Sequence, residues 1–215
     1  MAKAPWPGTV KTRLCPPLDA SEAASLYRCF LIDKIAAVRS LVNVRPVIAY
    51  SPDESRAEFA GLAPDFALVP QRGADLGARL HTTLSGLLRD GHPGAIAVDS
   101  DTPTLPREFL QQAVDCLARR EVDVVLGPTE DGGYYLIGLP TAAAVLFGGV
   151  PWSTSAVLEV TLGKAAAGGL RTVCLPTWFD VDTPDDLRRL ERMLNGGSEA
   201  AADGQTGRFF ASRRR

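Results

Sequence analysis

The residues Ala95-Ile96-Ala97-Val98-Asp99-Ser100-Asp101-Thr102-Pro103 carry the clearest sign of how this chain folds. They begin with a short apolar run, which is typical of an interior strand covered on both faces, and they end in polar residues and a proline. Such strands belong to open α/β sheets, in which ligands bind beyond the carboxyl ends of the strands. The segment after Val98 is therefore the first place to look for chemistry.

Apolar runs separated by helical patterns also occur before and after this segment. Apolar runs predict strands near residues 46–50, 67–70, 95–99, 122–127, 134–138 and 170–175. Helical patterns lie between them, near residues 21–39, 53–62, 76–89, 107–119, 155–167 and 184–194. This alternation predicts the α/β class with a mostly parallel sheet.

The length and composition predict one domain followed by a tail. The chain has 215 residues, of which 46% are hydrophobic, enough for one substantial core and too little for two ordinary domains. We expect a single domain over residues 1–194. From residue 195 the sequence turns to Gly, Ala, Ser and Gln and ends in arginines, so residues 195–215 are expected to be a disordered tail. A basic tail that binds an acidic partner is the alternative.

Charge, cysteine and apolar content exclude several classes of protein. The formal net charge is −2, which argues against a nucleic-acid binder, since such domains usually have a basic excess. The four cysteines form no CxxC pair, and two histidines are too few for a His-rich metal site. No apolar stretch reaches about 18 residues, so we expect no membrane span and no secretion signal. Free thiols fit a reducing, cytoplasmic setting.

Two carboxylates follow the apolar run that ends at Val98. Asp99 and Asp101 stand two residues apart, so on an extended backbone they face the same side, where like charges repel unless a cation lies between them. Carboxylate oxygens suit Mg²⁺ or Mn²⁺, and Mg²⁺ normally shares its coordination sphere with substrate phosphates. The alternative is that Asp101 or Thr104 caps the helix expected near residue 107. We favour the metal site, because a cap needs one such residue and two are present.

A second acidic segment, Trp178-Phe179-Asp180-Val181-Asp182-Thr183-Pro184-Asp185-Asp186-Leu187, precedes the last expected helix. Asp180 and Asp182 alternate on one face, and Pro184 suits the first position of that helix. The local sequence is equally compatible with Asp182 as a second metal ligand and with Asp182 or Thr183 as a plain helix cap.

The chain opens with a loop rich in cations, Lys3-Ala4-Pro5-Trp6-Pro7-Gly8-Thr9-Val10-Lys11-Thr12-Arg13-Leu14. Prolines and a glycine stiffen it, and such a loop can direct backbone N–H groups, Lys11 and Arg13 at phosphate oxygens. The alternative is a solvated basic terminus. The loop is not a Walker A sequence, because the GxxxxGK[ST] spacing is missing.

Two further segments combine glycines with charged residues. In Gly127-Pro128-Thr129-Glu130-Asp131-Gly132-Gly133-Tyr134-Tyr135, the paired glycines allow either a tight hairpin turn, which the local sequence favours, or close approach to a ligand. Gln71-Arg72-Gly73-Ala74-Asp75-Leu76-Gly77-Ala78-Arg79 is a loop that leads into a helix whose N-terminus could receive an anion. An ordinary surface loop is slightly favoured there.

The order of these segments resembles that of the nucleotide-diphospho-sugar transferase, or GT-A, superfamily. The nearest resemblance is to the bacterial DUF2064 or "transferase 1" glycosyltransferase-like family, with segments such as KxPxPGxVKTRL, QxGxDLGxR, SDxPTL, GPxxDGGYYLIG, WST and DxDTPxDL. In this chain they stand at 3–14, 71–79, 100–105, 127–138, 152–154 and 180–187, so the resemblance covers residues 2–194. The pattern also resembles 2-phospholactate guanylyltransferase and the molybdenum-cofactor nucleotidyltransferases.

This resemblance implies a three-layer α/β/α fold with a mostly parallel mixed sheet, and a set of site residues. The implied catalytic residues are Lys11, Arg13 and Asp101. The implied ligands of Mg²⁺ or Mn²⁺ are Asp101 and Asp182, with Asp99 as a further candidate. The implied nucleotide and phosphate contacts are Lys3, Gly8, Lys11, Thr12, Arg13 and Asp75. The implied contacts on the acceptor or sugar side are Asp131, Gly132, Gly133 and Trp152.

The resemblance also implies a metal-dependent transferase acting on a nucleotide or nucleotide-sugar and a small-molecule acceptor. We favour glycosyl transfer from an NDP-sugar. The alternatives are nucleotidyl transfer from an NTP to a phosphorylated small molecule, with release of pyrophosphate, and a nucleotide-binding protein without turnover. Relatives usually have an apolar strand ahead of the basic loop, whereas this chain begins at the loop. Its first strand is therefore expected to be missing, either because the start is recorded too late or because the strand has been lost.

Overall fold

The computed structural model describes residues 1–196 and 204–213. Its strands are β1 (Ala2–Lys3), β2 (Val47–Ser51), β3 (Ala67–Pro70), β4 (Ala95–Val98), β5 (Val124–Pro128), β6 (Tyr134–Leu139) and β7 (Thr172–Cys174). Its helices are α1 (Ala20–Arg39), α2 (Arg56–Leu62), α3 (Leu76–Arg89), α4 (Arg107–Ala118), α5 (Val157–Ala167), α6 (Pro184–Gly196) and α8 (Gln205–Arg213). Short 3-10 turns are η1 (Thr12–Leu14), η2 (Asp53–Ser55) and η3 (Ala144–Leu146).

The strands and helices expected from the sequence are present, and their ends agree with the prediction to within two residues with one exception. The helix expected at 53–62 opens with η2 and becomes α-helical only at Arg56. Among the described residues, no helix combines the length and the apolar character needed to cross a lipid bilayer.

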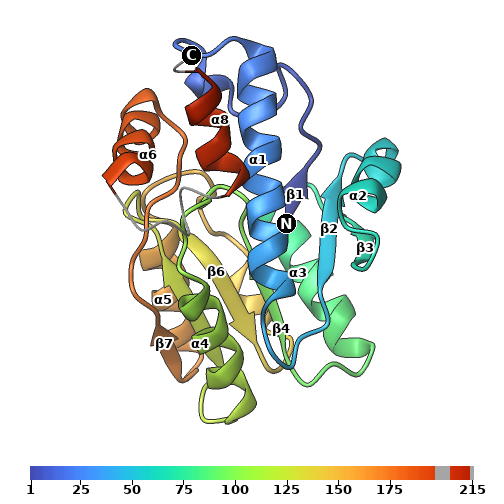
Figure 1. Ribbon diagram of the computed structural model, residues 1–215. Coiled ribbons are helices and arrows are strands. Elements are labelled where there is room, and N and C mark those ends of the chain that lie inside the picture. Colours follow the sequence, from blue (N-terminus) through green and yellow to red (C-terminus); the bar gives the residue numbers. More distant parts are fainter. Residues whose placement is uncertain (197–203, 214–215) are drawn as a thin grey trace.

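The strands form two sheets that lie edge to edge (Figure 1). β1, β2 and β3 are parallel neighbours in that order, and the second sheet has the order β4-β6-β5-β7. β6 is antiparallel to both its neighbours, whereas β5 and β7 are parallel. The amino nitrogen of Met1 donates a hydrogen bond of 2.8 Å to Val98 O, so β1 joins the two sheets. The prediction of a mixed, parallel-rich α/β fold is confirmed.

Helices cover both faces of the second sheet, which explains the continuous apolar runs of its strands. On β5, Val124 and Leu126 belong to the same apolar cluster as Leu84 of α3. Val125, which lies between these two residues in the sequence, belongs to another apolar cluster together with Leu110 of α4. Because successive side chains of a strand point to opposite faces, α3 and α4 lie on opposite sides of the sheet. The result is the expected arrangement of three layers.

The first strand is present, contrary to the expectation that it is missing, but it has only two residues. Ala2 and Lys3 pair with Tyr50 and Ser51 of β2 in parallel register. The Lys3 backbone N–H also donates to the hydroxyl of Tyr27 on α1. The cationic loop therefore begins at the carboxyl edge of the sheet.

The prediction of a disordered tail is wrong for residues 195–196, which end α6, and for residues 204–213, which include helix α8 packed against α1 (Figure 1). Asp33 of α1 accepts hydrogen bonds from the backbone N–H groups of Gln205 and Thr206, which caps the new helix. Phe210 is buried against α1, and Arg213 forms an ion pair with Glu22. A pair of aromatic residues in a polar segment was the overlooked signal. The rest of the tail, 197–203 and 214–215, lies outside the described residues.

Candidate functional site

The side chain of Lys11 is the centre of the candidate site. Lys11 stands just before η1 in a left-handed backbone conformation, which is uncommon for a residue with a side chain. Its ammonium group forms ion pairs with Asp101 Oδ1 and, at 2.7 Å, with Asp182 Oδ1. The Lys11 side chain is only 3% exposed, whereas the two carboxylate side chains are 40% and 39% exposed. One buried cation thus holds together two acids that still face solvent.

Three loops at one edge of the molecule supply these side chains. Lys11 follows β1, Asp101 follows β4, and Asp182 immediately precedes α6. The backbone N–H of Val181 donates to Asp101 O at 3.0 Å, which fixes the two acidic loops to each other. Arg13 adds a second cation, with its Nη1 atom 3.9 Å from Asp182 Oδ2 and its side chain 71% exposed. The structure therefore brings together the predicted metal and phosphate residues of three distant segments.

The protonation of Lys11 follows from its surroundings. Burial acts to lower its pKa, but the charges of Asp101 and Asp182 and their hydrogen bonds outweigh this effect and raise the pKa above the ordinary value. Lys11 therefore stays positively charged, and the group of three carries one net negative charge.

Asp99 does not join this group, in contrast to its expected place beside Asp101. Its Oδ1 accepts a hydrogen bond of 2.6 Å from the Thr102 hydroxyl and lies 3.5 Å from Lys34 Nζ. Lys34 reaches this point from α1 and also donates to Thr102 Oγ1 at 2.6 Å. β4 ends at Val98, so the two acids no longer share one strand face. The structure assigns Asp99 to a buried polar network behind the loop that carries Asp101.

A cleft of about 310 Å³ opens beside Arg13 and Asp182. Its other lining residues are Glu130, Asp131, Phe179, Asp180, Thr183 and Asp186. Glu130 accepts two hydrogen bonds from the guanidinium of Arg189, and Asp182 pairs with Lys11. Asp186 accepts hydrogen bonds from uncharged groups at the start of α6. The five carboxylates that line the cleft outnumber the neighbouring cations Arg13, Lys11 and Arg189, so negative charge is in excess.

The excess of negative charge affects the pKa of Asp180. Burial raises its pKa to about 7, and the negative charges of Asp131 and Asp182 add to the effect. Asp180 was seen in the sequence only as the alternating partner of Asp182, and the structure places both in the same cleft. A positively charged ligand is the direct way to relieve such a concentration of carboxylates.

The residues present fit a divalent cation that is shared with a ligand. No group of three or more Asp, Glu, His or Cys side chains that could hold a metal occurs among residues 1–196 and 204–213, so a cage built from protein alone is not seen there. Asp101 and Asp182 nevertheless converge on one point, where the Lys11 ammonium now lies. Two carboxylates with the remaining positions left to water and phosphate oxygens is a usual arrangement for Mg²⁺.

The other residues expected in the cationic loop have the following places. Gly8 has a φ of +76°, which favours glycine, and a Cβ at this position would meet no atom within 4 Å. Thr12 begins η1 and Lys3 lies in β1 with an exposed side chain. Their backbone positions belong to the loop, and their phosphate contacts remain predictions.

The remaining expected residues have structural explanations in addition to any role toward a ligand. Asp75 Oδ1 accepts a hydrogen bond from Ala78 N and so caps α3. Trp152 packs edge-on against Tyr134 and lies over Gly77, where a Cβ would approach its ring to 2.4 Å. The side chain of Asp131, in the cleft, accepts hydrogen bonds from Thr129 and Gly133 within the β5–β6 turn.

Gly132 is required by packing of the protein itself. Its φ is +89°, and a Cβ at this position would come within 2.0 Å of Ser155 O. Its carbonyl accepts a hydrogen bond from Leu158 N of α5. The hairpin reading favoured by the sequence is correct, since β5 and β6 are antiparallel neighbours.

Sequence reasoning missed two contributors to this region. Helical periodicity places Lys34 on the buried face of α1, but no local pattern indicates its partners Asp99 and Thr102. Arg189 forms an ion pair with Glu130, which is far from it in the chain. Its Cζ atom also lies 4.0 Å from the centroid of the Phe179 ring. Neither relationship has a signal in the sequence alone.

The fold defines the class of protein. Its mixed sheet between helical layers is the fold of nucleotide-diphospho-sugar transferases, and in this chain a cationic loop and two acidic loops meet at one edge of the sheet. A solved structure from Desulfovibrio desulfuricans G20, provisionally named a nucleotide-diphospho-sugar transferase, is 31% identical with a TM-score of 0.91, over 99% of this chain and 92% of that chain.

The family model DUF2064, described as uncharacterized proteins conserved in bacteria, matches residues 34–154. This is more than half of the chain, and the protein belongs to the DUF2064 family. The family expected from the sequence is thus confirmed.

Two further relatives bear on the reaction. The phosphoenolpyruvate guanylyltransferase of Mycobacterium marinum is 27% identical over 194 residues, 84% of this chain and 81% of the relative. The 2-phospho-L-lactate guanylyltransferase of Methanothermobacter thermautotrophicus is 27% identical over 181 residues, 82% of this chain and 76% of the relative. The comparisons support a transferase, and they favour the nucleotidyl alternative over the glycosyl transfer that the sequence led us to prefer.

Proposed function

We propose that this protein is a nucleotidyltransferase that joins an NTP to a phosphorylated small acid and releases pyrophosphate, with GTP as the first candidate donor. The observation that carries the proposal is the meeting of Lys11, Asp101 and Asp182 at one point, with Arg13 beside them. A cation site next to two phosphate-binding cations suits a triphosphate. The names of the two guanylyltransferase relatives support the reaction type and the donor.

Asp101 and Asp182 are the residues that would hold Mg²⁺ or Mn²⁺. Their carboxylate side chains are 40% and 39% exposed, and Asp182 lines the cleft, so an ion held between them would remain open to phosphate oxygens. When bound, the ion supplies positive charge against the phosphates and the departing pyrophosphate.

Lys11 and Arg13 bind the phosphates of the donor. In the absence of ligand the ammonium of Lys11 is neutralised by the two acids. With those carboxylates holding a divalent cation, the Lys11 ammonium would be free to pair with phosphate oxygens, and Arg13 would reach them from the exposed side. The residues thus exchange partners when the ligand binds.

The transfer needs no reactant other than the NTP and the phosphorylated acceptor. A phosphate oxygen of the acceptor attacks the α-phosphorus of the NTP, and the bond between this phosphorus and the oxygen bridging to the β-phosphate breaks. Pyrophosphate leaves with the electron pair. The acceptor brings negative charge of its own, so binding next to Asp131 and Asp180 depends on Arg13 and the divalent cation.

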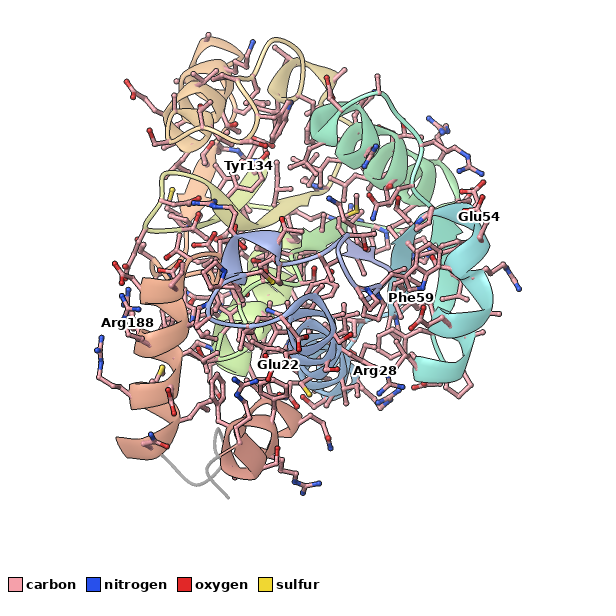
Figure 2. All side chains as sticks on the ribbon, turned by 90° about the horizontal axis from the view of Figure 1, so that it is seen from above. Glu22, Arg28, Glu54, Phe59, Tyr134 and Arg188 are labelled. Carbon is pink, nitrogen blue, oxygen red and sulfur yellow. The ribbon has the colours of Figure 1, made fainter. Side chains whose placement is uncertain are left out.

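The test is release of pyrophosphate from GTP in the presence of phosphoenolpyruvate or 2-phospholactate, with Mg²⁺ or Mn²⁺. We expect pyrophosphate only when the acceptor and the metal are both present, and a panel of ATP, CTP and UTP identifies the preferred base. Asp101→Asn should abolish the signal. Glu54→Gln is the matched control, because Glu54 lies at the outer edge of the molecule, far from α6 and its labelled Arg188 (Figure 2).

Two other results of this experiment would each support a different function. Release of NDP from NDP-sugars would support glycosyl transfer, the second candidate, which the name of the Desulfovibrio neighbour favours. Nucleotide binding with no product under any metal would support a binding protein without turnover.

A further inference from the structure

The side chain of Tyr27, on α1, lies next to the ammonium group at the centre of the candidate site. Tyr27 is only 3% exposed, and the centroid of its ring lies 5.9 Å from Lys11 Nζ. The ring of Phe30, also on α1, has its centroid 5.7 Å from the same atom. Both distances are within the range at which an aromatic ring attracts a cation. The ammonium that joins Asp101 and Asp182 is therefore supported by α1 as well.

The hydroxyl of Tyr27 links the cationic segment to the acidic loop. It accepts a hydrogen bond of 3.2 Å from the backbone N–H of Lys3, where the segment that leads to Lys11 begins. It also shares a hydrogen bond of 2.7 Å with Ser100 Oγ, one residue before Asp101. Burial and the nearby charge of Asp101 raise the pKa of Tyr27, so its hydroxyl keeps its proton. One buried hydroxyl thus joins two segments that are distant in the chain.

The loop that carries Asp101 is held on its other side by Lys34. The ammonium of Lys34 donates a hydrogen bond of 2.6 Å to Thr102 Oγ1, one residue after Asp101. Tyr27 and Lys34 are seven residues apart, which is about two helical turns, so they lie on the same face of α1. Ser100 and Thr102 are 7% and 0% exposed, whereas the side chain of Asp101 is 40% exposed. Both neighbours of Asp101 are thus buried and hydrogen-bonded to α1.

We propose that Tyr27 is a positioning residue for the cation site: its hydroxyl fixes Ser100 and thereby holds the Asp101 carboxylate opposite Asp182. The inference rests on the metal site of the proposed function. Because Tyr27 is buried, it acts through the loop and not by contact with a ligand. Two carboxylates from separate loops bind one ion well only when both are held in place, so a loop that shifts lowers the affinity for the ion.

Two substitutions remove the same hydrogen bond from opposite sides. Tyr27→Phe deletes the hydroxyl and keeps the ring next to Lys11, and Ser100→Ala deletes the other partner. Tyr135→Phe is the matched control, because Tyr135 is also buried and its hydroxyl donates to Pro176 O at 3.0 Å, on the segment after β7. Calorimetry measures the affinity for GTP with and without Mn²⁺. The ratio of the two affinities isolates the part that depends on the metal.

We expect Tyr27→Phe to lower this ratio about tenfold, the lower end of the effect of losing an outer partner of a metal ligand. The affinity for GTP without Mn²⁺ should stay within about twofold of the wild type. Ser100→Ala should lower the ratio as much, and the double variant no further, because both changes remove one hydrogen bond. Tyr135→Phe should keep the wild-type ratio, whatever stability it loses.

Two results would overturn the positioning role while the cation site stands, as shown by loss of metal-dependent binding in Asp101→Asn. One is an unchanged ratio in Tyr27→Phe. The other is a double variant in which the losses of Tyr27→Phe and Ser100→Ala add, because Tyr27 would then act by another route. If thermal unfolding shows that Tyr27→Phe does not fold, an unchanged ratio in Ser100→Ala overturns the role by itself. A wild-type ratio in Asp101→Asn would overturn the cation site, and this inference with it.

Discussion

Lys11 Nζ lies 2.7 Å from Asp182 Oδ1, although 171 residues separate them in the chain. The same nitrogen pairs with Asp101, so one ammonium links the loops after β1, after β4 and before α6. A lysine buried between two half-exposed acids marks the point where a cation is stabilised. The first two predictions concern this point.

Asp101→Asn and Asp182→Asn should each weaken Mn²⁺-dependent nucleotide binding by at least about 100-fold, because loss even of an outer partner of a metal ligand costs about 10–100-fold. Calorimetry with GTP, with and without Mn²⁺, measures the effect. Thermal unfolding confirms that the variants are folded, and Glu54→Gln serves as the control. Wild-type affinity in Asp101→Asn with Mn²⁺ present would remove this residue from the metal site.

Lys11→Ala should change the binding of two ligands in opposite directions. Mn²⁺ alone should bind about tenfold more tightly, because the ammonium no longer competes for Asp101 and Asp182. A nucleoside triphosphate should bind at least about tenfold more weakly, with little change for the nucleoside. Arg28→Ala, on an exposed position of α1 (Figure 2), is the matched control. Equal losses for triphosphate and nucleoside would indicate a folding defect instead.

Lys34→Met should lower the free energy of unfolding by about 3 kcal/mol, because it leaves the Asp99 carboxylate buried without its counter-ion. The double variant Lys34→Met/Asp99→Asn should lose less than the sum of the two single changes. Urea unfolding of the four proteins gives the coupling. Strict additivity would mean that Lys34 and Asp99 do not stabilise each other.

Phe210→Ala should destabilise the protein by about 3 kcal/mol, since Phe210 is 5% exposed and large core truncations cost about 3–5 kcal/mol. Ser212→Ala, at an exposed position of the same helix, should leave the stability unchanged. The comparison is made by chemical unfolding. Equal stability of the two variants would show that α8 does not contribute to the core.

Gly132→Ala should destabilise by at least about 1 kcal/mol, because a Cβ there meets Ser155 O and the φ of +89° is unfavourable for alanine. Gly148→Ala is the control, since a Cβ at that glycine meets no atom within 4 Å. Thermal unfolding separates the two. A stable Gly132→Ala variant with weaker acceptor binding would instead return Gly132 to a ligand-binding role.

The sequence predicted the elements well because their signals are local. Apolar runs such as residues 95–98 and 134–138 identify strands wherever the neighbours lie, and the caps that the structure shows at Asp19 and Asp75 act within a few residues of the helix start. Helix α8 was missed because its stability comes from Asp33 and the apolar face of α1, which a composition rich in Gly, Ala and Arg conceals.

The sequence by itself determined the α/β class, the order of the strands and helices along the chain, and which loops carry acids and cations. Only the tertiary structure decided that Asp182 faces Asp101 across Lys11 while Asp99 turns to Lys34. The physical reason is that hydrophobic periodicity and capping act over a few residues. Charge pairing and burial depend instead on which distant loops leave the same edge of the sheet.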